Sequence, residues 1–522
     1  MQAIGDEAFS GCTALVSLKL GDGLISIGKK AFLNCRLLPN VAFGPSLAHV
    51  GDAAFSGCAG LGELTVGNAL QTVGANAFFG CASLKELTLP DSVTSVGAKA
   101  FGGCTGLETV TLGRNANLAE GALNGCGSIK TMTLSYVKAV PFGYFFGMDS
   151  YSDGMTVTQK YNSSTRNYCV PSRLASVTVK SGSIPADAFK GFSSLTAVRV
   201  EREVREVGDA AFSGCTALQS FYMGSNGFYS GYTNNTFYKA GKTSGGIRVT
   251  VGPAVSRIPN ALFGLSTSTP ESDALPVLLS VEFEQGSTCT SIGQHAFYCT
   301  SLTSITLPDT VQTIGDSAFR GGALQSITLP KDLRRLDQYA FEGCQYLTSV
   351  VIPDKVQSIS NSCFSGCRRL TSVTIGKGVT YVAQGAFWGC SYLEELYLNA
   401  TNLSGWGMTI GSTPELPFES AGRGGSGFTL YVGANVTHLP EYMFYSDEPG
   451  NQGLSPKITR VVFAEGSVCE SIGKYAFYRC DSLSRIDFMG TTTQWEAITK
   501  NSEWRSGTAL TQVNCSNGTV TL

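Results

Sequence analysis

A repeat of 23 residues runs through much of this chain and restricts its fold more than any other feature. Its clearest unit is Leu84 to Gly106, LKELTLPDSVTSVGAKAFGGCTG. The aromatic residue that follows alanine marks the period. The position recurs first every 23 residues and later less regularly, with leucine in place of the aromatic residue at 123. Its occurrences are Phe9, Phe32, Phe55, Phe78, Phe101, Leu123, Phe145, Phe189, Phe212, Phe297, Phe319, Phe341, Phe364, Phe387, Phe444 and Phe477. A fixed period of this length predicts a solenoid, in which each repeat forms one coil and stacks on its neighbours.

The pattern inside one repeat predicts the parts of a coil. Leu87 and Leu89 alternate with polar residues, which places both leucines on one face of a short strand. Pro90 cannot donate to a strand ladder, so it should end that strand. Val93 and Val96 form a second inward pair. The A-K-A-F-G-G-C segment that follows is too short for an independent helix and predicts a single helical or 3₁₀ turn.

Leucines at this spacing are typical of leucine-rich repeats. We therefore expect a mainly β, α/β solenoid: a right-handed leucine-rich-repeat superhelix of about 17 coils with short strands and single helical turns. The predicted domains are a solenoid over residues 1–490 and a C-terminal cap over residues 491–522.

Two repeats carry a resemblance to a known family. S-I-G-K-K-A-F-L-N-C-R-L-L (Ser26–Leu38) and T-I-G-D-S-A-F-R-G-G-A-L (Thr313–Leu324) resemble the BspA-type leucine-rich repeats of bacterial cell-surface proteins. The resemblance covers about Met1 to Phe488, with interruptions. It implies a secreted or surface-anchored, adhesin-like protein that binds host or matrix proteins. It does not identify the ligand, because the family is defined by its scaffold.

The repeat is interrupted three times, near residues 135–188, 224–289 and 399–469. The last two interruptions are similar to each other, since Gly245–Phe263 matches Gly424–Phe444. Proline replaces the corner glycine in these segments, so each should still form coils from which longer polar loops leave the solenoid. In the tail, Thr493 is the predicted N-cap of a helix over 494–500. Trp495 and Ile498 are three residues apart, so they should share one face of this helix and cover the core of the last coil. The Asn517-Gly518 pair predicts the turn of a final hairpin.

Seventeen cysteines raise the question of disulfides. Because Cβ atoms of stacked parallel rungs do not face each other, we expect reduced thiols in buried columns. Cys289 and Cys469 take an inward valine position, and Cys363 replaces an alanine. Only Cys169 and Cys515 lie outside the columns. The repeat's own cysteine position is assigned to Cys12, Cys35, Cys58, Cys81, Cys104, Cys126, Cys215, Cys299, Cys344, Cys367, Cys390 and Cys480. With no C-x-x-C pair, we expect no metal site and no cofactor.

Composition excludes several classes of protein. A formal charge of −2, with 15% charged residues, argues against a nucleic-acid footprint, which needs a basic stripe. No run of 18 apolar residues occurs, so no membrane insertion is expected. The chain begins in mid-coil without a signal peptide or cap. We expect a fragment of an extracellular protein, and a cytosolic protein with a frayed first coil is the alternative.

The interruptions carry aromatic residues among Asn, Gly, Ser and Thr, a composition typical of adaptable recognition surfaces. For Tyr229, Tyr232 and Phe237, packing inside a modified coil remains an alternative to binding. Tyr161, Tyr168 and Trp406 are expected to be exposed. The candidate binding residues are Tyr144, Tyr151, Tyr161, Tyr168, Phe228, Tyr229, Tyr232, Tyr238, Trp406, Tyr442 and Tyr445.

The outward strand positions offer a second candidate surface, a mostly threonine row. Threonine also simply suits an exposed strand, which is the alternative interpretation. The row consists of Lys19, Ala42, Thr65, Thr88, Thr111 and Thr133.

The three histidines, His49, His295 and His438, have no nucleophile or carboxylate at a recurring spacing, so we expect no enzyme. The sequence instead favours a scaffold that binds an extracellular protein or glycan. The alternative is a structural spacer that presents another domain.

Overall fold

The computed structural model describes residues 2–229, 235–264, 275–406, 416–445 and 455–522. Contacts between residues divide it into two compact units, which are described separately. Unit 1 holds residues 2–229, 235–254 and 275–277, and unit 2 holds residues 255–264, 278–406, 416–445 and 455–522.

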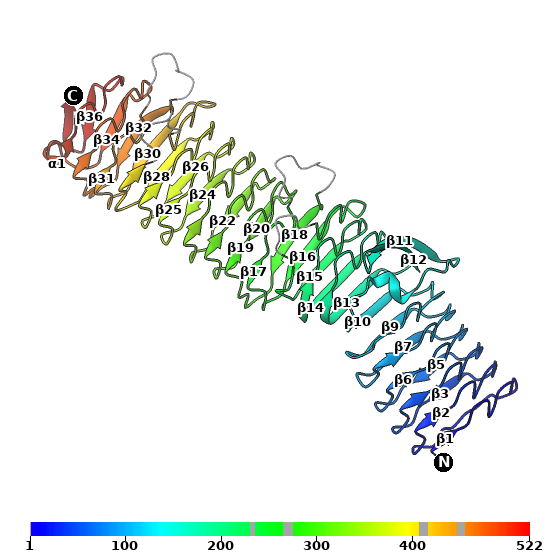
Figure 1. Ribbon diagram of the computed structural model, residues 1–522. Helices are drawn as coiled ribbons and strands as arrows, with labels where there is room; N and C mark the ends of the chain where they lie inside the picture. The colour runs from blue at the N-terminus through cyan, green and yellow to red at the C-terminus, as the bar shows by residue number, and fades with distance from the viewer. Residues whose placement is uncertain (1, 230–234, 265–274, 407–415, 446–454) are drawn as a thin grey trace. The chain divides into compact units, whose positions relative to one another are not determined.

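Unit 1 is a stack of short parallel strands, two per regular coil (Figure 1). The strand before the proline position forms one row: β3 (Asn40–Ala42), β5 (Glu63–Thr65), β7 (Glu86–Thr88), β9 (Thr109–Thr111), β10 (Thr131–Tyr136), β13 (Ser176–Ile184), β14 (Ala197–Val207), β15 (Ser220–Met223) and β16 (Ile247–Val251). The second strand of each coil forms another row: β1 (Ala3–Ile4), β2 (Ser26–Ile27), β4 (His49–Val50), β6 (Thr72–Val73) and β8 (Ser95–Val96). Between β10 and β13 lie a 3₁₀ turn, η1 (Phe142–Phe145), and an antiparallel hairpin, β11 (Gly154–Tyr161) and β12 (Ser164–Pro171).

Unit 2 repeats the same arrangement. Its first row is β18 (Leu278–Phe283), β20 (Ser304–Thr306), β22 (Ser326–Thr328), β24 (Ser349–Ile352), β26 (Ser372–Ile375), β28 (Glu395–Leu398), β30 (Phe428–Val432), β32 (Ile458–Phe463), β34 (Arg485–Phe488) and β36 (Gln512–Cys515), with β37 (Gly518–Thr521) antiparallel to β36. Its second row is β17 (Arg257–Ile258), β19 (Ser291–Ile292), β21 (Thr313–Ile314), β23 (Arg335–Leu336), β25 (Ser358–Ile359), β27 (Tyr381–Val382), β29 (Gly405–Trp406), β31 (His438–Leu439), β33 (Ser471–Ile472) and β35 (Thr499–Lys500). The one α-helix of the described residues is α1 (Thr492–Ala497).

The alternation in the sequence places the core as predicted. Leu87, Leu89, Val93 and Val96 are at most 2% exposed. The aromatic residues of the repeat stack in a column, with ring centroids 5.0–5.3 Å apart from Phe9 to Phe101. The mainly β solenoid fold is therefore confirmed, whereas the number of coils and the division at residue 490 stay predictions.

The turn that carries the aromatic residue is not the predicted helical turn. Alternate N–H groups of this turn donate to carbonyls of the next coil. The Phe101 N–H donates to the carbonyl of Ala122, and the Gly103 N–H to that of Asn124. Lys99 and Gly103 adopt left-handed backbone angles, with φ of 54° and 68°. The result is a pair of tight turns whose remaining N–H groups form a ladder between coils. A helical or 3₁₀ turn would direct these donors back into the same coil.

The cysteine columns form as predicted at most positions. The Cys58 thiol donates to the carbonyl of Phe32 and the Cys104 thiol to that of Phe78, each at 3.2 Å. Burial raises the pKa of Cys58 and of Cys344 to about 12, so these thiols are poor nucleophiles.

Two of these cysteines are not buried as predicted. Cys12 keeps the repeat position, since its N–H donates to the Phe9 carbonyl as that of Cys35 does to Phe32, but it is exposed. Cys299 is only half-buried, because it sits one residue early in its repeat. Thr300 takes the buried cysteine position, and its hydroxyl donates to the Phe297 carbonyl at 3.1 Å.

The C-terminal helix begins two residues earlier than predicted. Thr491 is the N-cap in place of Thr493, and its side chain accepts the Gln494 N–H. The Gln494 side chain in turn accepts the Thr491 N–H at 2.8 Å, which completes a capping box. Trp495 and Ile498 are buried, as expected. Thr499 and Lys500 belong to β35 rather than to the helix, because they continue the second strand row beside β33.

A buried carboxylate links the last strands of unit 2. Asp487 on β34 is 4% exposed and accepts hydrogen bonds from Arg460 at 2.6 Å, Arg485 at 2.8 Å and Asn514 at 2.8 Å. Burial by itself raises the pKa of Asp487, but these three donors outweigh it and lower the pKa below its ordinary value.

Asp487→Asn is therefore expected to destabilise unit 2 by about 1.5–3 kcal/mol at neutral pH, the range for hydrogen bonds to a charged group. Since the pKa is lower in the folded state, this contribution is complete above the unfolded pKa near 4 and is lost as pH falls through the folded value. Urea unfolding at pH 7 and pH 3 should show a smaller difference between wild type and variant at pH 3. An equal difference at both pH values contradicts the assignment.

Candidate functional site

The first interruption of the repeat forms a hairpin rather than the predicted polar loop. β11 and β12 pair over their full length, from Gly154 opposite Pro171 to Tyr161 opposite Ser164. Asn162 and Ser163 form the two-residue turn, and both have left-handed φ angles of 50° and 63°. Paired left-handed residues are the geometry of a type I′ hairpin turn. The sequence shows Asn-Ser here in place of the usual Asn-Gly signal, which is why the hairpin was missed.

The hairpin is fixed to the coils by Gln159, which is 1% exposed. Its side-chain oxygen accepts the N–H of Gly143 at 2.9 Å, and its side-chain nitrogen donates to the carbonyl of Ala188 at 2.7 Å. One buried amide therefore bridges the turns of two coils. Val157 and Tyr168, at 2% and 0% exposed, pack the inner face of the hairpin onto those turns.

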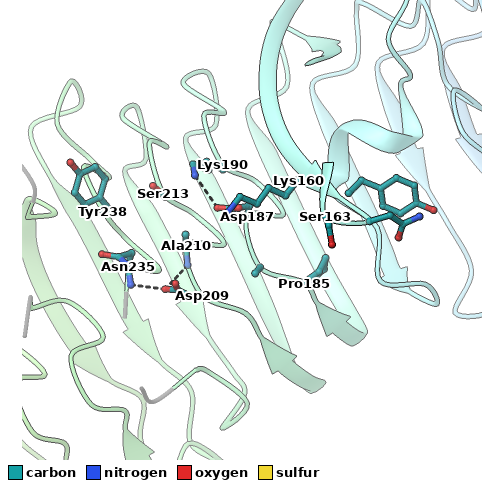
Figure 2. A pocket seen from close by; sticks show the side chains of 13 residues that line it. Lys160, Ser163, Pro185, Asp187, Lys190, Asp209, Ala210, Ser213, Asn235 and Tyr238 are labelled. Atoms are coloured by element: carbon teal, nitrogen blue, oxygen red, sulfur yellow. Dashed lines mark hydrogen bonds and ion pairs between the residues drawn. The ribbon is translucent and has the colours of Figure 1, made fainter. Parts of the chain in front are cut away.

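The tip of the hairpin and the adjacent coil turns border an open surface hollow of about 690 Å³. Residues 160–163 line it on the hairpin side. Residues 185–187, 190, 209, 210, 213, 235 and 238 line it on the coil side. In Figure 2, Tyr238 and Ser163 lie at opposite ends of the labelled row, with Asp187, Asp209 and Asn235 between them.

The two carboxylates of the hollow already have partners. Asp187, 8% exposed, pairs with Lys190 at 3.1 Å. Asp209 accepts the N–H groups of Ala210 at 2.9 Å and Asn235 at 2.7 Å (Figure 2). Because both carboxylates stabilise the turns around them, neither is arranged as a general base.

Two of the predicted binding residues, Tyr161 and Tyr238, line this hollow, and both are half-buried. The Tyr161 ring lies 5.3 Å from the ring of Tyr144 and 5.1 Å from the Arg166 guanidinium. Tyr144 itself is only 7% exposed, so it packs against Tyr161 from the interior of the protein.

Other predicted residues lie in the core or outside the hollow. Tyr168 was expected to be exposed, and this is wrong: it is fully buried, because it lies opposite the buried Val157 of β11, on the inner face of the hairpin. Phe228 is 3% exposed and packs against Phe221. Tyr151 is half-buried, and its hydroxyl donates to the Cys169 carbonyl at 3.2 Å.

Of the three residues with a packing alternative, Phe237 is buried at 1% exposure, whereas Tyr229 is 41% exposed. Tyr232 lies outside the described residues, as does the side chain of Trp406.

Unit 2 holds a separate tyrosine cluster, formed by Tyr442, Tyr445, Tyr475 and Tyr478. All four rings are half-buried, and neighbouring ring centroids lie 5.1–5.8 Å apart. The Lys474 ammonium lies 4.7 Å from the centre of the Tyr475 ring. Two coils thus contribute the same two turn positions, which stack into a two-by-two array.

The threonine row is interrupted by aromatic residues that the sequence analysis did not single out. On β15, the Tyr222 ring lies 3.6 Å from the Arg199 guanidinium of β14. On β28 and β30, Tyr397 and Tyr431 stack with ring centroids 4.6 Å apart. The outward strand face is therefore more varied than a uniform threonine row.

The repeat sequence matches the model of one protein family, described as a BspA-type leucine-rich repeat region in six copies. The matched segments are residues 1–108, 71–182, 182–270, 279–404 and 429–503. The chain belongs to the BspA-type leucine-rich repeat family. Comparison with curated proteins gave no match.

Several solved structures are similar to this BspA-type protein, among them leucine-rich repeat proteins. One from Bacteroides ovatus ATCC 8483 is 22% identical, covers 76% of this chain and 82% of its own, and has a TM-score of 0.27. A leucine rich cell surface protein from Faecalibacterium prausnitzii A2-165 is 19% identical, with coverages of 96% and 86% and a TM-score of 0.21. The pneumococcal vaccine antigen PcpA is 13% identical, with coverages of 85% and 92% and a TM-score of 0.29. Because these sequence identities and TM-scores are low, the family assignment rests on the match of the repeat sequence.

The sequence analysis did not identify several residues of the hollow and of the tyrosine cluster. In the hollow these are Lys160, Asp187, Lys190 and Asp209, and in the tyrosine cluster they are Tyr475 and Tyr478. The cluster had a readable signal, because Y-M-F-Y (Tyr442–Tyr445) and Y-A-F-Y (Tyr475–Tyr478) occupy the same register. The hollow had no such signal in the sequence, because its two sides come together only when the hairpin folds onto the coil turns.

No group of three or more His, Cys, Asp or Glu side chains among the described residues is arranged to hold a metal ion. In the same part of the chain, no helix has the length and apolar character needed to span a bilayer.

Proposed function

We propose that this BspA-type protein is a non-catalytic scaffold, secreted or displayed at a bacterial surface, that binds an extracellular protein or glycan in the manner of an adhesin. The observation that carries the proposal is the hollow between the hairpin tip and the coil turns of unit 1. The hairpin leaves the regular stack and is fixed to it by a buried glutamine, so its tip adds a second wall beside the coil turns.

The chemistry of the hollow supports binding rather than catalysis. Its carboxylates are engaged by Lys190 and by backbone N–H groups, and none of the described residues that line it is a histidine or a cysteine. Nucleophilic catalysis pairs a nucleophile with an oriented base. Here the lining offers hydroxyls, amides, an ammonium and two phenols beside the small apolar side chains of Pro185, Ala186 and Ala210, a mixture typical of recognition surfaces.

The test is saturable binding of the whole chain to panels of immobilised matrix proteins and glycans. A hairpin-tip variant, Lys160→Ala with Tyr161→Ala, should weaken that binding at least about tenfold, as loss of a central contact residue does. The matched control is Tyr346→Ala with Tyr392→Ala, since both rings are exposed, at 48% and 51%, and lie in unit 2.

Unchanged thermal melting of both variants would show that the fold is intact. A folded chain that binds nothing in either panel overturns the proposal and favours a structural spacer. Binding that the control variant loses, and the hairpin-tip variant keeps, places the site in unit 2 instead.

A further inference from the structure

The formal charges that line the hollow cancel. Two lysines, Lys160 and Lys190, face two aspartates, Asp187 and Asp209. Lys190 and Asp187 neutralise each other at 3.1 Å, and the Asp209 carboxylate is held by two backbone N–H groups. Within the part of the chain that the structure describes, Lys160 has no ion pair. An anionic ligand would approach two carboxylates and a cationic ligand two ammonium groups, so the balance favours a neutral one.

The remaining polar groups are hydroxyls and amides. Asn162 and Ser163 contribute them from the hairpin turn, and Ser213 and Asn235 from the coil turns. Such groups both donate and accept hydrogen bonds, which matches a ligand that carries many hydroxyl groups. A protein partner instead needs an apolar, desolvated centre for its contact residues. Among the described residues that line this hollow, the aliphatic side chains are the small ones of Pro185, Ala186 and Ala210, and none is Leu, Ile, Val, Met or Phe.

Aromatic rings stand on both sides of these polar groups. Tyr161 belongs to the hairpin and Tyr238 to a coil turn, and the Lys239 ammonium lies 5.5 Å from the centre of the Tyr238 ring. A phenol ring offers an apolar face to C–H groups while its hydroxyl stays available for hydrogen bonds. Sugar rings have this dual character, with C–H groups on their faces and hydroxyls around their edges.

The hollow is organised before a ligand arrives. Gln159 fixes the hairpin to the coil turns, and Tyr144 and Arg166 flank the ring of Tyr161. Asp187 and Ala210, at equivalent positions of neighbouring coils, both adopt left-handed φ angles, of 58° and 53°. A preformed site loses little conformational entropy on binding. Its volume of about 690 Å³ is within the range of small-ligand pockets, roughly 300–1,000 Å³.

We propose that this hollow binds a short segment of a neutral oligosaccharide, with sugar rings against Tyr161 and Tyr238 and with hydroxyls bonded to the amides, hydroxyls and charged groups between them. The inference rests on the proposed binding function and names the ligand class for the same site.

The experiment is titration calorimetry of the whole chain with neutral trisaccharides, namely maltotriose, cellotriose, the N-acetylglucosamine trimer and galactosyl-lactose. Sialyllactose and a heparin tetrasaccharide are the acidic probes. Binding of a neutral trisaccharide should change less than about twofold between 0.05 M and 0.5 M salt, because no net charge is neutralised.

The variants separate ring stacking from hydrogen bonding. Tyr238→Ala should weaken binding about tenfold, because it removes one ring face. Tyr238→Phe keeps that face and should weaken binding less. Tyr346→Ala with Tyr392→Ala again serves as the control, since these rings lie in the other unit.

The outcomes distinguish this inference from the proposed function. Binding of acidic probes alone, with a steep salt dependence, overturns the inference and leaves the adhesin-like function in place. The same holds if a matrix protein binds, the hairpin-tip variant loses it, and no sugar binds. If neither sugars nor matrix proteins bind to the folded chain, both proposals fail. Equal loss of binding in Tyr238→Phe and Tyr238→Ala also overturns the stacking arrangement.

Discussion

Phe55→Ala should destabilise unit 1 by about 3–5 kcal/mol, the range for removing a fully buried phenylalanine. The Phe55 ring is 0% exposed and stacks on Phe32 at 5.0 Å and on Phe78 at 5.3 Å. It also lies 6.1 Å from the ring of Phe43. The variant would leave a cavity between two coils that cannot collapse, because the ladder hydrogen bonds fix the spacing between coils.

The neighbouring coil offers a matched control for this variant. Phe79 follows Phe78 directly, but its side chain is 41% exposed. Phe79→Ala removes the same atoms from the outer surface, so its effect should stay within about 0.5 kcal/mol. Urea unfolding gives the size of both effects. Amide hydrogen exchange should place the loss of protection from Phe55→Ala in the coils next to residue 55, because each coil contacts only its neighbours. Equal effects of the two substitutions would contradict the stacked-column description.

Trp495→Ala should destabilise unit 2 by about 3–5 kcal/mol and cause self-association. Trp495 is 1% exposed and lies against Phe463 at 5.7 Å, Phe488 at 5.5 Å and Trp504 at 6.4 Å. Its removal uncovers the aromatic residues of the last strands. Open solenoid ends with apolar surface associate, which is why terminal caps have a polar outer face.

The control for this variant is Trp388→Ala, because Trp388 also lies in unit 2 but is 40% exposed. Denaturant unfolding measures the loss of stability, and light scattering at increasing protein concentration measures association. Trp388→Ala should remain monodisperse to the same extent as wild type. A Trp495→Ala protein that is less stable but does not associate would mean that the helix stabilises the last strands without covering an association surface.

Sequence alone determined the coil, because the information is local and repeated. The alternation around Leu87 and the period of Phe55 and Phe78 follow from strand geometry and from stacking, and neither depends on distant residues. The buried position of Trp495 was also readable, since an aromatic residue in a short helix after the last repeat has one apolar surface to cover.

Shifts of one or two residues in register caused errors in the positions predicted from sequence. Cys299 was placed at the buried cysteine position although its repeat is one residue short, so Thr300 occupies the position. Thr491 was passed over as N-cap, because Thr491, Thr492 and Thr493 look equivalent until the reciprocal bond with Gln494 distinguishes them.

Only the tertiary structure decided where the candidate site lies. The hollow joins residues 160–163 to residues 187, 209 and 235, and these meet because Gln159 binds two coil turns that are 45 residues apart in sequence, at Gly143 and Ala188. The burial of Tyr168 was settled in the same way, since the pairing of β12 with β11 fixes which of its faces turns inward. A repeat pattern records what each coil shares with its neighbours. The hairpin, the hollow and the tyrosine cluster depend on what differs between coils, and stacking is the physical step that brings those differences together.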